Sequence, residues 1–395
     1  MLLENQNAKP SFISFGGLTL KVIYPLLMGA SHILISISYE LFDINKEGNF
    51  NQYEYFLLLI MFFSESLIFI VYLIHLYLSK SKSQSRRSIL KPKQMKTQAK
   101  IKIILKIVLL LFICSTLDLI RNISTMNIRS SKTITNFFEV ILKIVSIPLI
   151  SLLTVWILNY KYYRHHYIGY LITAFGLMIE PTYQLIMNNN SDFDIGTLLL
   201  LTVFFLIGAL LEVLEKYLMD IQYLSPYLII SVEGFIGIIV VSILLIFFKG
   251  ETIVLEIDDF FKCIHLLKKE KFKIGIIIYA IGIFIYNILR LLTNQRCSPT
   301  HLIIADCFGS FLGWILNFSI YFLRQEEKVQ NDFYIQLTLM GIGYVFIFIG
   351  LIIFLEFIVI NKWGMNNNTT FNIQSRATEE IDNMPIINTS YSSFG

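Results

Sequence analysis

The chain has 395 residues, of which 55% are hydrophobic and only 15% are charged, and its mean hydropathy is +0.65. This composition excludes an ordinary soluble domain, because a soluble domain of this length needs many more polar residues to wet its surface. The net charge of +4 is small, and it is informative only through where the basic residues lie along the chain.

Apolar runs of membrane-spanning length alternate with short polar loops, which predicts an all-α membrane protein of about ten spans. Each run is long enough to cross a hydrocarbon core of ~30 Å at about 1.5 Å per residue. Because neighbouring runs can be merged or divided, nine and eleven spans are alternatives. The predicted spans are 17–37, 53–79, 101–120, 134–157, 165–185, 197–215, 226–248, 274–292, 300–323 and 333–360.

The basic residues predict the orientation of the spans. The loop 80–102 is rich in lysine and arginine and contains no acidic residue, which marks it as cytosolic. Both termini, 1–16 and the polar tail 361–395, are then cytosolic as well. The tail ends in Tyr391-Ser-Ser-Phe394, which resembles an endosomal or lysosomal sorting signal. We therefore expect a multi-pass protein of an endomembrane, such as that of the vacuole, lysosome or Golgi.

The loop 249–273 does not fit this charge pattern, because it falls on the lumenal side and yet holds several lysines together with acids. Its segment 257–267 has the pattern of an amphipathic helix lying on the membrane surface, and a plain connecting loop is the alternative. The four cysteines of the chain show no CxxC spacing, so we expect no metal site, no redox site and no cofactor.

An internal repeat divides the chain into two halves, 17–185 and 186–360. Short matches recur in the same order at offsets of 168 to 179 residues, and the offset changes only across loops. The matches pair Leu27-Met28-Gly29-Ala30 with Leu206-Ile207-Gly208-Ala209, Glu65 with Glu233, Asp118 and Arg121 with Asn287 and Arg290, and Gly169 and Gly176 with Gly343 and Gly350. Because five spans is an odd number, the second half is inverted in the membrane, which is the geometry of alternating access.

Several short motifs carry a resemblance to a known family. They are Met61-Phe62 before Glu65, Leu117-Asp118-Leu119, Glu212 with Glu215-Lys216-Tyr217, Ser225-Pro226 before Glu233-Gly234, and Asp306 after Ser298. At these residues the chain resembles the drug/metabolite transporter superfamily. Within it, the chain is most similar to the solute carrier family 35 subgroup (EamA-type) akin to the chloroquine-resistance-transporter-like proteins. The resemblance covers nearly all ten spans and implies two inverted five-helix repeats that transport small organic solutes.

The chain departs from this resemblance in its fourth span. The family usually has a Gln-Met-Leu-Arg-Gly stretch there, whereas the corresponding stretch of this chain is Asn136-Phe-Phe-Glu139-Val140. A glutamate then stands where the family has an arginine. This difference disfavours anionic nucleotide sugars as substrates and favours neutral or cationic solutes.

Charged residues inside the predicted spans are the first candidates for transport, because a charge in the bilayer is costly unless it is paired or hydrated. Glu65, near the middle of its span, could exchange a proton or contact a cation, and a hydrogen-bonded structural carboxylate is the alternative. His32 could sense pH or simply pack in the first span. The substrate or coupling candidates are Glu65, Asp118, Glu139, Lys143, Glu233 and Asp306.

A second group of residues near the ends of spans consists of candidates for a gate. Candidates of both groups also have structural interpretations: Asp118 and Arg121 are spaced for a local ion pair, and so are Glu139 with Lys143 and Glu212 with Lys216. Arg290 has the position of an arginine that extends to the membrane interface. The gate candidates are Arg121, Asn287, Arg290, Glu212 and Lys216.

These features predict a secondary transporter of small organic solutes. Coupling of this transport to protons is part of the hypothesis. No phosphate-binding loop and no hydrolase or metalloprotease motif is present, so we expect neither an ATP-driven pump nor an enzyme. A scaffold or receptor that retains the transporter fold without transporting is the alternative. The expected partners are a small solute, the lipid bilayer and protons, and we expect no nucleic acid. The sequence leaves the substrate and the oligomeric state open.

Overall fold

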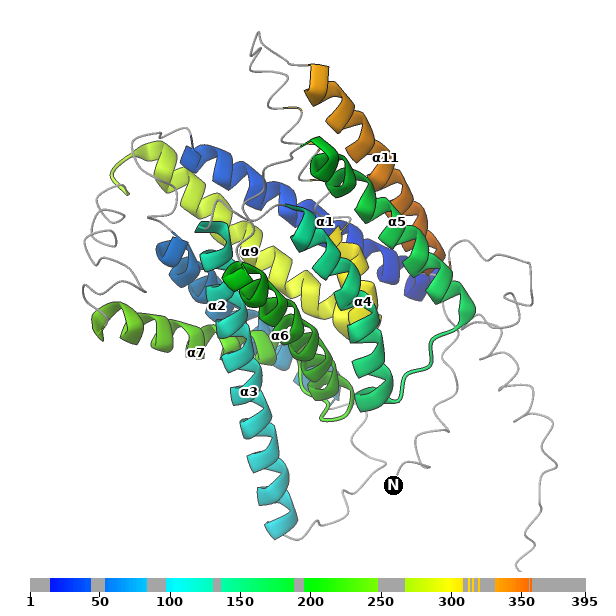
Figure 1. Ribbon diagram of the computed structural model, residues 1–395. Helices are drawn as coiled ribbons and strands as arrows, with labels where there is room; N and C mark the ends of the chain where they lie inside the picture. Colours follow the sequence, from blue (N-terminus) through cyan, green and yellow to red (C-terminus); the bar gives the residue numbers. More distant parts are fainter. Residues whose placement is uncertain are drawn as a thin grey trace, which may run out of the picture.

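The structure is a computed structural model, and the part of the chain that it describes is all-α (Figure 1). It describes residues 15–43, 54–83, 97–130, 136–187, 195–247, 267–307 and 331–354, together with the single positions 312, 315, 319 and 356. The labelled helices are α1 (Phe15–Asp43), α2 (Glu54–Ser83), α3 (Thr97–Ser130), α4 (Asn136–Leu158), α5 (Arg164–Met187), α6 (Ile195–Asp220), α7 (Pro226–Phe247), α9 (Glu270–Arg296) and α11 (Asn331–Phe354). A further helical stretch covers 299–307.

Each predicted span except the ninth falls largely within one labelled helix. The ninth, 300–323, starts in the helical stretch 299–307 and then continues mostly outside the described residues. The proposed surface helix 257–267 also lies outside them except for its last residue, as do Cys263, the first fourteen residues and the tail 361–395.

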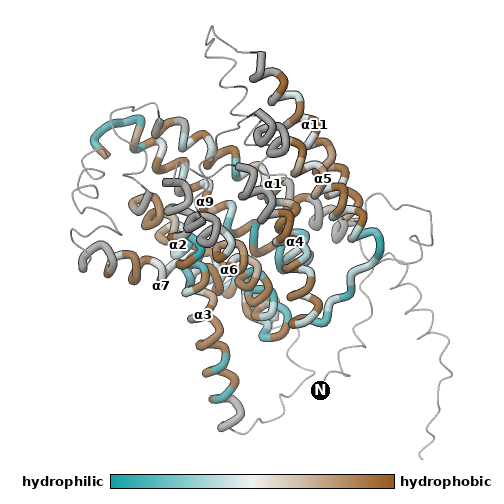
Figure 2. The backbone as a smooth tube through the Cα atoms, viewed as in Figure 1, coloured by the Kyte–Doolittle hydropathy of each residue, from teal (hydrophilic) through white to brown (hydrophobic). Residues whose placement is uncertain are grey.

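Four helices of the described part are long and apolar enough to cross a membrane, over Phe56–Leu78, Ile101–Ile123, Pro226–Ile243 and Glu270–Arg296. Shorter apolar stretches lie at Leu27–Tyr39, Ile144–Leu158 and Thr338–Phe354. The span in α3 has a mean hydropathy of 2.5, although only 17% of it is buried inside the protein. Figure 2, in which the backbone is coloured by hydropathy, shows hydrophobic residues (brown) along most of the helices. A helix that exposes so much apolar surface is stable in lipid and not in water, so these helices indicate a membrane-embedded protein.

The helices pack in long side-by-side pairs: α1 with α9, α2 with α7, α3 with α6, and α5 with α11. The α5–α11 pair is antiparallel, since Gly169 approaches Gly350 while Gly176 approaches Gly343. Because glycine has only a hydrogen atom as its side chain, the two backbones can touch. Close packing of this kind holds helices together in lipid, where there is no hydrophobic driving force between them.

The crossing of α2 and α7 places two acidic residues at the centre of the helix bundle. A Cβ atom added at Gly234 would lie 2.5 Å from the backbone nitrogen of Ser66 and 2.7 Å from Cβ of Glu65. Only glycine allows so close an approach, because real Cβ contacts are longer than about 3 Å. The adjacent Glu233 is therefore held at the same level of the bundle as Glu65.

Candidate functional site

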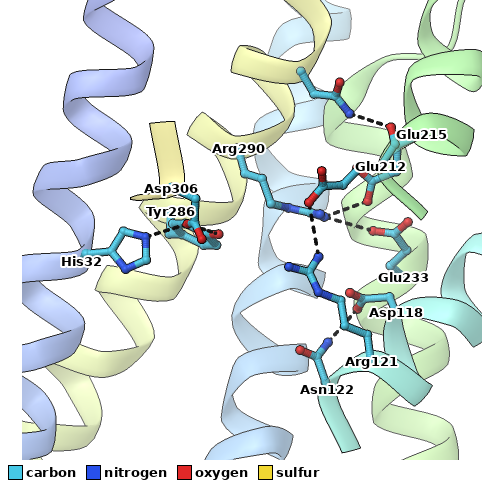
Figure 3. A network of polar contacts seen from close by, with 11 residues as sticks. His32, Asp118, Arg121, Asn122, Glu212, Glu215, Glu233, Tyr286, Arg290 and Asp306 are labelled. Carbon is cyan, nitrogen blue, oxygen red and sulfur yellow. Dashed lines mark hydrogen bonds and ion pairs between the residues drawn. The ribbon is translucent and has the colours of Figure 1, made fainter. Parts of the chain in front are cut away.

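Charged and amide side chains from five helices meet where apolar helices pack, and we call this set the central polar network. It consists of Glu65 on α2, Asp118 and Arg121 on α3, Glu212 and Glu215 on α6, Glu233 on α7, and Asn287 and Arg290 on α9. All but Arg121 are nearly inaccessible, with exposed fractions between 0% and 6%. Figure 3 shows Arg290 surrounded by acidic side chains.

Helical spacing explains why these residues face one region. Glu212 and Glu215 are three residues apart, and so are Asn287 and Arg290, so each pair lies on one face of its helix. Most of the other residues in the middle of these helices are apolar and pack against neighbouring helices or face outward. Each helix thus turns its few polar side chains away from lipid, as the cost of exposing them there requires.

Arg290 is the most heavily paired cation of the network. Its Nη2 atom donates to Glu215 Oε1 at 2.8 Å and lies 3.9 Å from Glu233 Oε2. The interpretation of Arg290 as an interface-seeking anchor is wrong, because its exposed fraction is only 4%. Its place near the end of a span suggested the interface, but its helical face points to carboxylates on α6 and α7, which offset the cost of burying the charge.

The other members of the network pair more loosely or through amides. Asn287 Nδ2 donates to Glu65 Oε1 at 2.8 Å. Arg121 Nη1 lies 3.8 Å from Glu212 Oε1, which joins α3 to α6. Asp118 accepts a hydrogen bond of 3.0 Å from Asn122 Nδ2 on its own helix. Asp118 and Asn287, which the sequence analysis paired, both lie near Glu65 in this buried region.

The network is rich in negative charge, and several of its buried polar atoms have no hydrogen-bond partner among the described residues, Nε and Nη1 of Arg290 included. It contains five carboxyl groups and two guanidinium groups. One oxygen each of Glu65, Glu212, Glu215 and Glu233 is buried without a hydrogen-bond partner among the described residues. A buried polar atom left unpaired costs roughly 1–3 kcal/mol. Such a set of unpaired carboxylate oxygens is suited to holding protons, water or a cationic group.

A second polar cluster lies beside this network and is more exposed. His32 Nε2 on α1 is 2.9 Å from Asp306 Oδ1, and Tyr286 on α9 donates its hydroxyl to the same oxygen at 3.0 Å. The His32 and Asp306 side chains are 24% and 38% exposed. Tyr286 precedes Arg290 by four residues, so α9 links this cluster to the network, and Figure 3 shows the two groups beside each other.

Lys216 belongs to a separate group at the end of α6. Its Nζ atom lies 3.2 Å from Asp220 Oδ2 and donates to the carbonyl oxygen of Gln295 at 2.8 Å. Tyr160, in the segment between α4 and α5, donates its hydroxyl to Asp220 at 3.2 Å. Burial, reinforced by the Asp220 charge, raises the pKa of Tyr160 above its ordinary value. The tyrosine therefore stays protonated and acts as a donor to Asp220.

Of the six substrate or coupling candidates, Glu65, Asp118 and Glu233 lie in the central polar network, and Asp306 lies in the cluster beside it. Glu139 and Lys143 fall in the first two turns of α4, whose side chains lie outside the described part of the structure. Of the gate candidates, Arg121, Asn287, Arg290 and Glu212 are network members, whereas Lys216 contacts the Asp220 group.

Two residues of the site received no role from the sequence. Glu215 entered only through the family resemblance, yet it is fully buried and makes the shortest ion pair of Arg290. Its position three residues after Glu212 within an apolar helix was the available signal. Tyr286 carried no such signal, because a tyrosine in an apolar helix is ordinary, and only its contact with Asp306 reveals it.

The arrangement can bind and release positive charge inside an apolar bundle. Carboxyl groups on α6 and α7 pair with arginines on α3 and α9, so a relative shift of any of these four helices would change which carboxyl groups are paired. We find no match to this chain among the profiles of known protein families or among curated proteins.

Proposed function

We propose that this protein is a secondary transporter of small organic solutes that works by alternating access. The observation that carries the proposal is the central polar network, because a buried, carboxylate-rich cluster in a membrane-embedded bundle is costly, and such clusters typically mark the path of a ligand or ion. Its residues come from both halves of the chain, as a site between two moving halves requires. In this proposal Glu65 and Glu233 contact the solute or its coupling proton, and Arg121 and Arg290 balance their charge.

The packing of the helices supports two inverted five-helix repeats, 17–185 and 186–360. In the proposed repeat α1 corresponds to α6, α2 to α7 and α3 to α9. The contact of α1 with α9 then has its counterpart in the contact of α6 with α3, and the contact of α2 with α9 has its counterpart in that of α7 with α3. All four contacts are present. The same correspondence turns the approach of Gly169 to Gly350 into that of Gly343 to Gly176. Such reciprocity is expected of a pseudo-two-fold axis in the membrane plane, and it accords with the drug/metabolite transporter resemblance.

We expect wild-type protein in proteoliposomes to take up at least one solute of a metabolite panel. A change of Glu65 to Gln keeps a side-chain oxygen that can accept the hydrogen bond from Asn287, but it removes the ionisable group. We therefore expect the pH dependence of uptake to disappear and the rate to fall at least about tenfold, or ~1.4 kcal/mol in the barrier. The measurement is initial uptake with and without an imposed pH gradient.

Glu270→Gln is the matched control, because Glu270 is exposed at the start of α9, outside the network. It should leave uptake and its pH dependence unchanged. If the wild type moves none of the solutes, the transporter proposal fails. If Glu65→Gln retains the pH dependence, Glu65 has no role in proton coupling.

A membrane scaffold or receptor of the same fold is a second candidate. The tight pair between Arg290 and Glu215 favours it, since a fully buried ion pair at 2.8 Å also suits a purely structural role. The two functions differ in the uptake assay, because a scaffold retains its fold and partners while moving no solute.

The endomembrane location and the cytosolic termini are part of the same proposal, and they rest on the basic loop 80–102 and the tail motif. A protease-cleavable tag at the C-terminus should be cut in intact, isolated organelles without detergent. Protection of the tag until detergent is added would reverse the proposed orientation.

A further inference from the structure

A cluster of two histidines and one glutamate lies apart from the central polar network, at one end of the α5–α11 pair. His165 and His166 occupy the first turn of α5, and Glu356 lies just beyond the end of α11. His165 Nε2 is 2.7 Å from Glu356 Oε1, and His166 Nε2 is 3.8 Å from the same oxygen. One ligand atom from each of the three side chains lies within 4.8 Å of the other two.

The backbone of Glu356 is unusual for a glutamate. Its φ angle is +61°, in the left-handed region, and its N–H donates to the carbonyl oxygen of Ile353 at 3.0 Å. Glycine is the favoured residue at such a helix end, because a side chain there is strained. A carboxylate is held at this position and meets both histidine rings.

A second observation points to a ligand. The side chain of His165 is only 3% exposed, yet its Nδ1 atom has no hydrogen-bond partner among the described residues. A neutral histidine ring that ligates a metal through Nε2 carries its proton on Nδ1. No hydrogen-bond donor near His165 Nδ1 requires that atom to stay unprotonated. His166 differs, because its Nδ1 accepts a hydrogen bond of 3.1 Å from the backbone N–H of Tyr163. Binding through His166 Nε2 would break that one bond, a smaller loss than the gain of a metal–nitrogen bond.

We propose that His165, His166 and Glu356 form a binding site for a divalent transition-metal ion, with Zn²⁺ as the best fit. Two imidazoles with one carboxylate suit zinc, whereas magnesium and calcium prefer sets made only of oxygen. In a tetrahedral zinc site neighbouring ligand atoms are roughly 3.3 Å apart. The two distances to Glu356, 2.7 Å and 3.8 Å, bracket that separation, and the ligand atoms of the two histidines lie within 4.8 Å of each other, so side-chain rotations would bring all three to a common ion.

The surroundings of the cluster suit a site that excludes bulk water. The ring of His166 meets Tyr162, Phe354 and His301, at centroid distances of 5.6, 5.0 and 6.0 Å. Three protein ligands leave a fourth position, which water normally occupies in such zinc sites. The ion would join α5 to α11 at the end of their close interface, and so it would stabilise that pair. The sequence predicted no metal site because only the spacing of the cysteines was considered, whereas this ligand set joins His165 to a glutamate 191 residues away.

The test uses the full-length protein in detergent, stripped of metal with EDTA and titrated with Zn²⁺, and with Co²⁺ as a spectroscopic substitute. We expect about one equivalent of zinc per chain, visible Co²⁺ bands, and a higher melting temperature with zinc. X-ray absorption of the zinc complex should show nitrogen and oxygen neighbours and no sulfur. Glu356→Gln and His165→Ala should each weaken binding at least about tenfold.

His75→Ala is the matched control, since it removes an exposed histidine on α2 and should bind zinc like the wild type. The proposal is overturned if the wild type binds no stoichiometric zinc, or if Glu356→Gln binds it equally well. Should a variant fail to fold, the wild-type absorption spectrum decides alone, because sulfur neighbours or the lack of an imidazole signature would contradict this ligand set.

Discussion

Replacing Arg290 by methionine is expected to destabilise the protein by about 3–5 kcal/mol, the usual cost of breaking a buried ion pair by removing one partner. Methionine fills much of the space of the arginine stem, so lost volume is not the main effect. The cost arises because Glu215 and Glu233, which are 0% and 1% exposed, would keep their buried carboxyl groups without the cation between them. The measurement is thermal unfolding in detergent, together with the yield of monodisperse protein.

Arg296→Met on the same helix is the matched control for this substitution. Arg296 lies exposed in the last turn of α9, so its removal should change stability by less than about 0.5 kcal/mol. The double variant Arg290→Met with Glu215→Gln should lose less stability than the sum of the two single variants, because each substitution removes the charge that the other leaves unpaired. Equal melting of Arg290→Met and the wild type would show that the pair contributes nothing to the fold.

The positions of most helices could be predicted from the sequence because hydropathy acts locally. The predicted span 53–79 lies almost entirely in α2 (Glu54–Ser83), and 226–248 matches α7 (Pro226–Phe247). The agreement is poorer for α3, which runs from Thr97 to Ser130 although the predicted span is 101–120. Hydropathy marks only the part of a helix that suits lipid, whereas backbone hydrogen bonds continue the helix into polar residues.

The members of the central polar network could be predicted far better than their pairing. A carboxylate such as Glu65 or Glu233 within an apolar run is conspicuous in the sequence. The partner of Arg290, in contrast, is Glu215, which lies 75 residues away. That choice depends on how α6 and α9 are rotated about their axes and how closely they approach. Local spacing favoured pairs within one helix, but the contacts of Arg290 are made between helices.

The glycine matches show a related limit. Gly169 and Gly176 were aligned with Gly343 and Gly350 because the two pairs have the same spacing. The alignment predicted that the two pairs correspond but predicted no contact, and the structure shows that they meet each other across α5 and α11. The cluster of His165 and Glu356 lies at the end of the same interface, and it escaped prediction because its members are 191 residues apart.

The glycine interface yields the second large expected effect. Changing Gly343 to alanine would place a Cβ atom 2.7 Å from the carbonyl oxygen of Gly176. The obstacle is backbone, which cannot rotate away as a side chain would, so α5 and α11 must separate. We expect a loss of about 1–3 kcal/mol, the range of overpacked interiors, and a lower melting temperature. Zinc should also bind more weakly, since separation of the helices moves Glu356 away from His165.

Gly341→Ala provides the matched control two residues earlier on the same helix. A Cβ atom there meets nothing within 4 Å, so alanine adds no clash. Alanine is also about 1 kcal/mol better than glycine in a helix interior, so Gly341→Ala should leave the melting temperature unchanged or raise it. The two substitutions are chemically identical, and helix propensity alone predicts the same sign for both. Opposite signs would therefore establish that α5 and α11 are in backbone contact, whereas equal stabilisation by both would mean that the helices do not touch at Gly343.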